Sequence, residues 1–394
     1  MEMSTRARAA KRSVDVVTTF FSRIQALAAD EDALDFTFGN PHEMALPGLS
    51  SALRANAQPR SVDWFAYKSS ERSAQEVVAS GLRAELGLDF EPDDIAMTQG
   101  AFGAISLTFA LLADAGDEVV VPVPGWFCYE PTLYAADLVP VRAALDPETF
   151  DLDVDAIARA ISPRTRIVIV NSPANPTGRV YPKSAWDALA EELERASRRH
   201  GRRIWLLSDE PYRRIRFDGV EFASPAGSYP WTLIDYSYGK VLLAPGQRLG
   251  YLALSPHIPA AEREELRAAL FPLGLAIGWG FPDAIMQYSV PELESLTIDV
   301  QELERRRDRL YGVLTEAGVQ VTRPEGTFYL WGRAPGGDGR VFCDALAARG
   351  VYLMPGDLFD QPHHFRISLT ATMPMIDRAI PHMVDVARDL AQAS

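Results

Sequence analysis

The sequence predicts an α/β protein with a mainly parallel sheet covered by helices, together with a smaller, discontinuous α+β domain. Two patterns lead to this prediction. Between residues 50 and 256, short strands that are apolar throughout alternate with helices, which is typical of a parallel sheet buried on both faces. After residue 293 the chain becomes strongly charged and helical, with short strands between. The length of 394 residues suits two domains.

Hydrophobic spacing gives the elements of the first part in order. A helix is expected over 74–85, because Val77, Val78 and Leu82 recur at helical spacing. Similar patterns predict helices over 101–113 and 186–199. Short apolar runs predict strands over 94–98, 118–123, 138–142, 167–171, 204–208, 232–237 and 251–255.

The remaining elements suggest how the chain divides. An amphipathic helix is expected up to about Ala29, and the segment 35–39 has no strand partner nearby in the sequence. We therefore expect residues 1–48 to join the small domain, residues 49–292 to form the large domain, and residues 293–394 to complete the small one. In the last segment we expect a helix over 293–317, two or three short strands, and a helix over 376–391.

Composition excludes several classes of protein. With 39 Lys and Arg against 53 Asp and Glu, the net charge is −14, which disfavours a nucleic acid partner. Cys128 and Cys343 are too few for a disulfide framework or a cysteine-rich zinc site, so we expect no metal and a reducing, cytoplasmic location. No apolar run has membrane-spanning length, and the basic start of the chain lacks the apolar block of a secretion signal.

The residues that follow the strands point to a ligand site, because open α/β sheets bind ligands at the carboxyl ends of their strands. Gly100 opens a helix directly after the first strand, where free N–H groups suit a phosphate. The later strands are followed by Trp126, Asn175, Asp209 with Tyr212, Ser237 with Lys240, and Arg248.

Together these residues suit pyridoxal 5′-phosphate (PLP). A lysine such as Lys240 can form a Schiff base with an aldehyde, and a carboxylate such as Asp209 can keep a pyridine nitrogen protonated. Asn175 and Tyr212 can hydrogen-bond a ring hydroxyl oxygen, and Trp126 can stack on the ring. A phosphate can be held by Ser237, Arg248 and the N–H groups of Gly100, Ala101 and Phe102.

In order and spacing, three motifs resemble those of the class I/II aminotransferases, PLP-dependent enzymes of fold type I. These are Asn175-Pro176-Thr177-Gly178, Asp209-Glu210-Pro211-Tyr212, and Ser237-x-x-Lys240 followed by Arg248-x-Gly250. The resemblance extends from the segment 36–41 to the segment 365–368. It implies a large domain that binds PLP and a homodimer in which Tyr67 reaches the neighbouring active site. It also implies catalytic roles for Lys240, Asp209 and Tyr212, and substrate contacts from Gly39, Trp126, Asn175 and Arg366, the last binding the α-carboxylate.

Structural roles compete with some of these assignments. Asp209 could be a helix cap, Asn175 could shape a turn, and Trp126 could belong to the core. Phe328 or Tyr329 could touch substrate or only pack. The chain also departs from the family pattern, since Arg72 follows Tyr67 by five residues where glycine is frequent, and Gly239 precedes Lys240 where Ser, Thr or Ala is common.

The predicted function is transfer of an amino group from an L-amino acid to a 2-oxo acid. We expect a neutral, apolar or aromatic donor, because the segment 274–281 is apolar where the acid-specific branch of the family supplies an arginine. The same residues would serve a C–S β-lyase, a decarboxylase or an amino acid oxidase. A non-catalytic sensor of the same fold is disfavoured, because the chain has little room for a DNA-binding domain before Gly39.

Overall fold

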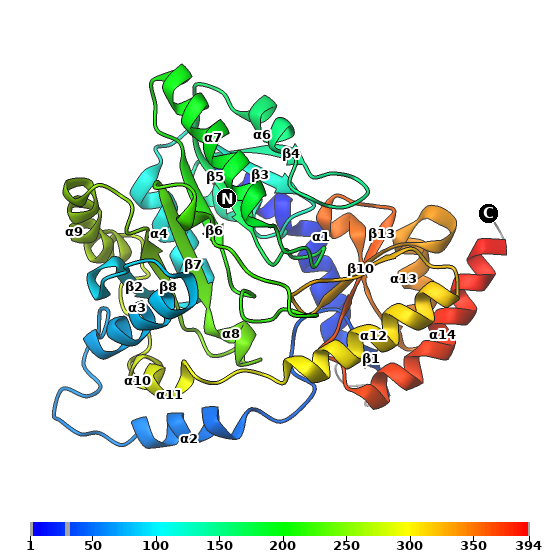
Figure 1. The fold of residues 1–394 in the computed structure, drawn as a ribbon. Coiled ribbons are helices and arrows are strands. Elements are labelled where there is room, and N and C mark those ends of the chain that lie inside the picture. Colours follow the sequence, from blue (N-terminus) through cyan, green and yellow to red (C-terminus); the bar gives the residue numbers. More distant parts are fainter. Residues whose placement is uncertain (1–2, 28–31, 393–394) are drawn as a thin grey trace.

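The computed structural model describes residues 3–27 and 32–392. Its largest element is a seven-stranded sheet with the order β2-β8-β7-β6-β5-β3-β4 (Figure 1). All neighbouring strands are parallel except the two pairs that contain β8, so the predicted mainly parallel sheet is confirmed. The strands are β2 (Ile95–Thr98), β3 (Glu118–Val123), β4 (Val139–Ala144), β5 (Thr165–Asn171), β6 (Trp205–Asp209), β7 (Thr232–Ser237) and β8 (Gly250–Leu254).

Helices cover both faces of this sheet. Successive side chains of a strand point to opposite faces, and Val119 and Val120 accordingly belong to different clusters of buried residues. The first face packs against α4 (Gly100–Leu112), α5 (Tyr129–Ala135) and α9 (Ala260–Ala276). The other packs against α2 (Pro47–Asn56), α3 (Arg72–Leu86), α6 (Val154–Ala160), α7 (Lys183–His200), α8 (Tyr238–Val241), α10 (Ala284–Tyr288) and α11 (Val290–Leu293).

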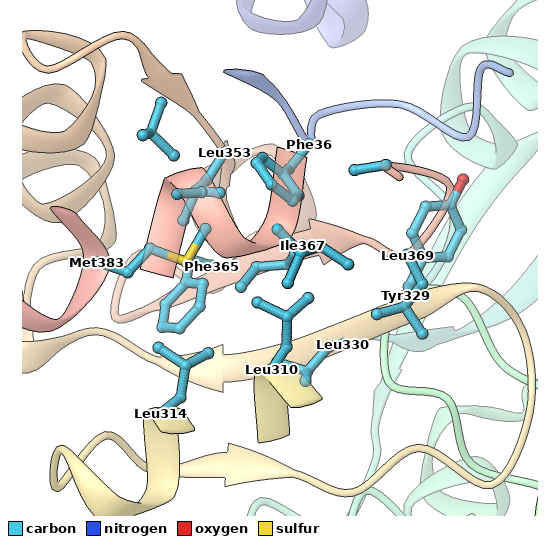
Figure 2. Close-up of a cluster of buried hydrophobic side chains, with 14 of the residues drawn as sticks. Phe36, Leu310, Leu314, Tyr329, Leu330, Leu353, Phe365, Ile367, Leu369 and Met383 are labelled. Atoms are coloured by element: carbon cyan, nitrogen blue, oxygen red, sulfur yellow. The ribbon is translucent and has the colours of Figure 1, made fainter. Parts of the chain in front are cut away.

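The C-terminal part has its own sheet and core. Figure 2 shows Phe365 and Ile367 of β13 between Leu310 and Leu314 of one helix and Met383 of another. The four-stranded sheet has the order β12-β13-β10-β9. With β11, this part contains five short strands among the described residues, more than the two or three predicted. The elements are α12 (Val300–Glu316), β9 (Val321–Thr322), β10 (Tyr329–Arg333), α13 (Gly339–Ala347), β11 (Val351–Tyr352), β12 (Met354–Pro355), β13 (His364–Ser368) and α14 (Met373–Gln392).

The helix predicted over 293–317 begins later than expected. The short α11 ends at Leu293, and α12 starts only at Val300. Asp299 caps the new helix, because its Oδ1 accepts a hydrogen bond from the Glu302 N–H at 2.9 Å. Just before it, the Ile298 N–H donates to the Val241 carbonyl at 2.9 Å. This contact with a distant segment could not be foreseen from the helical spacing.

The N-terminal segment contacts both parts of the molecule. β1 (Leu34–Asp35) pairs in parallel with β11. In contrast, α1 (Thr5–Leu27) packs against α5, a helix that covers the large sheet. Arg6 forms an ion pair with Asp137 at 2.8 Å, and Arg23 forms one with Asp344 of α13 at 2.7 Å. The helix therefore lies between the two sheets (Figure 1). The predicted helix end near Ala29 falls outside the described residues, and the boundaries at residues 48 and 292 stay predictions.

Within residues 3–27 and 32–392, no helix combines the length and the apolar character that a membrane crossing requires.

Candidate active site

A pocket opens at the carboxyl ends of β5, β6 and β7, the edge of the sheet at which the sequence predicted a ligand site. It brings together most of the predicted residues from strands far apart in the sequence. Its lining consists of Ala101, Phe102, Trp126, Asn171, Asn175, Asp209, Pro211, Tyr212, Ser237, Gly239, Lys240, Pro245 and Arg248. The parallel order of the strands accounts for this convergence.

Lys240 lies in α8, one short turn beyond the end of β7. Its Nζ lies 5.6 Å from the centre of the Tyr212 ring, which is itself buried. In the described part of the chain, no carboxylate forms an ion pair with Lys240. The amine is therefore available to react within the pocket.

Asp209 ends β6 and is 4% exposed. Its Oδ2 accepts a hydrogen bond from the Tyr129 hydroxyl, whereas its Oδ1 is buried and has no hydrogen-bond donor among the described residues. Burial raises the pKa of Asp209, and the positive charge of Lys240 acts in the opposite direction. A buried carboxylate oxygen without a donor is suited to a ligand N–H.

The side chain of Asn171 connects the backbone at Asp209 to the backbone at Asn175. Its side-chain NH₂ donates to the Asp209 carbonyl at 2.8 Å, and its Oδ1 accepts from the Asn175 N–H at 2.7 Å. These two bonds hold the end of β6 and the loop after β5 together.

The N-terminus of α4 forms an anion cradle with Arg248. The first N–H groups of a helix lack intrahelical acceptors, and those of Ala101 and Phe102 lie at this position. Gly100 has φ of +75°, and a Cβ there would lie 2.7 Å from Arg248 Nη2. Arg248 donates to the Pro245 and Gln99 carbonyls at 2.9 and 3.3 Å, and no described carboxylate pairs with it. Its charge is thus left for an anionic ligand.

Arg366 reaches the opposite side of Asn175 from β13 of the smaller sheet. Its Nη1 donates to Asn175 Oδ1 at 2.9 Å, and its Nη2 donates to the Thr37 carbonyl at 2.8 Å. The guanidinium lies 3.8 Å from the centre of the Tyr329 ring and is 1% exposed. Its Nε has no partner among the described residues, so this buried cation can still bind an anion.

Trp126 stands at the wall of the pocket among other aromatic rings. Its ring centre lies 4.8 Å from that of Phe102 and 5.3 Å from that of Tyr129. Edge contacts of this kind hold the indole in place and leave the rest of its surface free to contact a ligand.

Four predicted residues are not among those that line this pocket: Gly100 and Arg366, described above, and Gly39 and Tyr67. Gly39 lies beside Tyr329, and a Cβ at Gly39 would lie 2.2 Å from Phe328 and 3.0 Å from the Tyr329 hydroxyl. Tyr67 is 86% exposed, and its ring centre lies 4.8 Å from that of Phe281. Within this single chain, Tyr67 therefore takes no part in the pocket.

The site residues predicted from the sequence did not include three polar residues that lie at or beside the pocket: Tyr129, Asn171 and Asp235. Asp235 is fully buried on β7 and pairs in register with Asp209. The available signal was an acid within a predicted buried strand, because an acidic side chain is seldom fully buried unless it is paired. Tyr129 carried no comparable signal, since its bond to Asp209 depends on how α5 packs on the sheet.

Comparison with known proteins identifies the family. The sequence profile of the family "Aminotransferase class I and II" matches residues 33–382. The chain belongs to this family. The aminotransferase is 31% identical over 325 residues to an aspartate/prephenate aminotransferase of Thermus thermophilus, with 79% of this chain and 80% of that protein covered. It is 30% identical over 355 residues to a probable N-succinyldiaminopimelate aminotransferase of Mycobacterium tuberculosis, with 88% and 87% covered.

The fold agrees with this assignment. A crystal structure of an aminotransferase from Eubacterium rectale superimposes with a TM-score of 0.86 at 29% identity, covering 98% of this chain and 96% of that one. The aminotransferase therefore has fold type I, and PLP is its cofactor, as the motifs predicted. The pocket suits that cofactor, because it combines an unpartnered Asp209 Oδ1, the anion cradle and the free amine of Lys240.

We predict that Gly100→Ala weakens PLP binding about tenfold or more. The new methyl group would push Arg248 out of the cradle, which can be measured by titrating the apoenzyme with PLP and following the quenching of tryptophan fluorescence. Gly116→Ala is the matched control, because Gly116 also has positive φ, +88°, but no atom lies within 4 Å of its added Cβ. Equal affinity of the two variants would contradict a role for the cradle.

Proposed function

We propose that the aminotransferase moves the amino group of a neutral L-amino acid with an apolar or aromatic side chain to a 2-oxo acid. One observation supports this most directly. Among the pocket-lining residues, the only cations are Lys240 and Arg248, and Arg366 is a further cation that contacts the lining, through Asn175. If Lys240 reacts and Arg248 binds the cofactor phosphate, Arg366 remains for the substrate α-carboxylate.

The proposed cofactor contacts follow from the donors and acceptors around the pocket. Asp209 Oδ1 would accept from the protonated pyridine nitrogen, and the Asn175 amide and the Tyr212 hydroxyl would donate to the ring hydroxyl oxygen. Trp126 would cover one face of the ring. The phosphate would be held by Ser237, Arg248 and the backbone N–H groups of Gly100, Ala101 and Phe102.

Different side chains would carry out the proton transfer and the positioning of the substrate. Bound PLP supplies an electron sink for the charge that develops at the substrate α-carbon. Lys240 Nζ would take the proton from that carbon and return it to the cofactor, acting first as a base and then as an acid. Arg366 would orient the substrate through a two-pronged contact with its carboxylate, and Gly39, which lies beside Tyr329, would also contact the substrate.

The proposed side-chain preference follows from the described pocket lining, which contains no cation besides Lys240 and Arg248. The Thermus thermophilus relative is named for aspartate and prephenate, and aspartate carries a second carboxylate. In this chain the pocket wall offers Phe102 and Trp126 instead. A second carboxylate beside these rings would lose its hydration without gaining a partner, whereas an apolar side chain would gain contact area.

We further propose a homodimer that covers an exposed aromatic patch. The patch comprises Val62, Phe65, Tyr67, Phe271, Leu275, Ile277 and Phe281, each between 37% and 109% exposed. Phe281 connects two other rings of the patch, because its ring centre lies 4.8 Å from the ring centre of Tyr67 and 6.0 Å from that of Phe271. Exposed apolar side chains on two segments that meet at the Tyr67–Phe281 contact suit an interface, and Tyr67 would extend from it to the phosphate of the neighbouring subunit.

The free thiols of Cys128 and Cys343 agree with a reducing compartment. A cytoplasmic location is therefore part of the proposal.

Lys240→Ala should lower the rate of amino group transfer by about a hundredfold to ten-thousandfold, the usual contribution of a positioned acid–base group. PLP should still bind, since the phosphate and ring contacts are retained. Steady-state assays and cofactor titration measure the two effects separately. Lys183→Ala changes an exposed lysine and serves as the control. A Lys240→Ala enzyme with near wild-type turnover would refute the mechanism.

A panel of single amino acids tests both reaction and substrate class. When the enzyme is mixed with Phe, Leu, Met, Gln or Asp and no 2-oxo acid, the pyridoxamine form of the cofactor should accumulate, most rapidly with Phe, Leu or Met. Stopped-flow absorbance gives the half-reaction rates. Aspartate outpacing every neutral amino acid would overturn the proposed preference. Failure of all to yield the pyridoxamine form would instead favour another PLP reaction.

Light scattering should report a particle of twice the 43.4 kDa chain mass. Leu275→Arg, which places a charge in the aromatic patch, should release monomers with weakened PLP affinity. Val341→Arg alters an equally exposed apolar residue of α13, outside the patch, and should leave the mass unchanged. A fully active wild-type monomer would exclude the role proposed for Tyr67.

A further inference from the structure

Two acids stand side by side beneath the pocket. Asp209 of β6 and Asp235 of β7 are register partners in parallel strands, and both are buried, at 4% and 0% exposure. Each lies two residues beyond a leucine of the cluster that packs against α4 and α5, Leu207 and Leu233. Because side chains alternate between faces with a period of two, both carboxyl groups point to that same face.

Within the described residues, no cation forms an ion pair with either acid, although the charge of Lys240 acts on Asp209. Neither side-chain oxygen of Asp235 accepts a hydrogen bond from a described residue. On β8, the register partner of Asp235 is Leu252, and α4, which packs on β7, contains no ionisable residue. Two carboxylates on directly paired residues of neighbouring strands repel strongly in a buried site, so they cannot both be ionised.

The other titratable groups near the pair favour a charge on Asp209 rather than on Asp235. Tyr129 donates to Asp209 Oδ2, and Lys240 is the nearby cation that acts on Asp209. Tyr212 affects the pKa of Tyr129, but it is not among the groups that shift the pKa of Asp235. Glu210 is occupied by the hydroxyls of Ser208 and Ser224 and by Arg213 at 3.6 Å.

We propose that Asp235 is a positioning residue that stays protonated and donates its O–H to the Asp209 carboxylate. The donated bond keeps Asp209 ionised and fixes its orientation toward the pyridine nitrogen. Burial and the Asp209 charge both raise the pKa of Asp235 well above its usual range, which agrees with a neutral acid at this place. The inference rests on the proposed role of Asp209 as the partner of the cofactor ring.

The proton itself can be detected in the apoenzyme, without any catalytic readout. Infrared difference spectroscopy of wild type against Asp235→Asn at neutral pH should show the carbonyl band of one protonated carboxyl group, present only in the wild type. Absence of that band would overturn the proposal. This result does not depend on what Asp209 binds, so it separates failure of this inference from failure of the proposed function.

The pH dependence of PLP binding reports the effect on Asp209. As the pH falls through the pKa of Asp209, the carboxylate is protonated and affinity for PLP is lost. Asp235→Leu removes the donated bond, raises that pKa, and should move the loss of binding to higher pH, with about tenfold weaker binding at neutral pH. Asp235→Asn keeps a donor and should stay close to wild type. If Asp235 were ionised, both variants would relieve repulsion and move the loss to lower pH.

Two controls distinguish positioning from a general structural role. Thr232→Val removes a buried hydroxyl from the same strand and should lower stability without moving the pH of PLP loss. In an Asp209→Asn background, Asp235→Leu should have no additional effect on affinity, because its partner is already altered. Additive losses would show that Asp235 does not act through Asp209. If Asp235→Leu does not fold, the infrared comparison still decides the proton.

Discussion

The parallel register of β5, β6 and β7 is the constraint on which the rest of the site depends. It sets Asn171 opposite Asp209, and Asp209 opposite Asp235. Three polar groups therefore stand in a row at the carboxyl edge of the sheet. A slip of one residue in either pairing would turn an acid to the other face of the sheet. The apolar residues below, such as Leu207 and Leu233, fix this register by their burial.

The site concentrates charges that its surroundings leave incompletely paired. Among the described residues, the hydrogen-bond partners of the buried Arg366 are neutral, and Asp209 is buried beside a second acid. Burying a charge without an opposite charge is costly, so these residues oppose the stability of the fold. Ligands that carry a carboxylate, a phosphate and a protonated ring nitrogen would offset that cost. The same imbalance gives the pocket its selectivity for such ligands.

Much of the fold and the centre of the site could be predicted from the sequence. Apolar runs located all seven strands of the large sheet to within two residues at most ends, and Asp209, Tyr212 and Lys240 were found because they follow those strands directly. Contacts between distant segments could not be predicted. The gap between α11 and α12 contains Ile298, whose N–H bonds to the carbonyl of the distant Val241, and Tyr129 meets Asp209 through the packing of α5.

The environment of Arg366 has a consequence for how the protein is made. Its guanidinium bonds to Thr37 near one end of the sequence and Asn175 in the middle, and β13 lies inside its own sheet between β10 and β12. A ribosome delivers this strand after every strand of the large sheet. The large sheet can form earlier, since domains generally fold as units during synthesis. The residues that line the pocket can therefore come together before Arg366 is present beside Asn175.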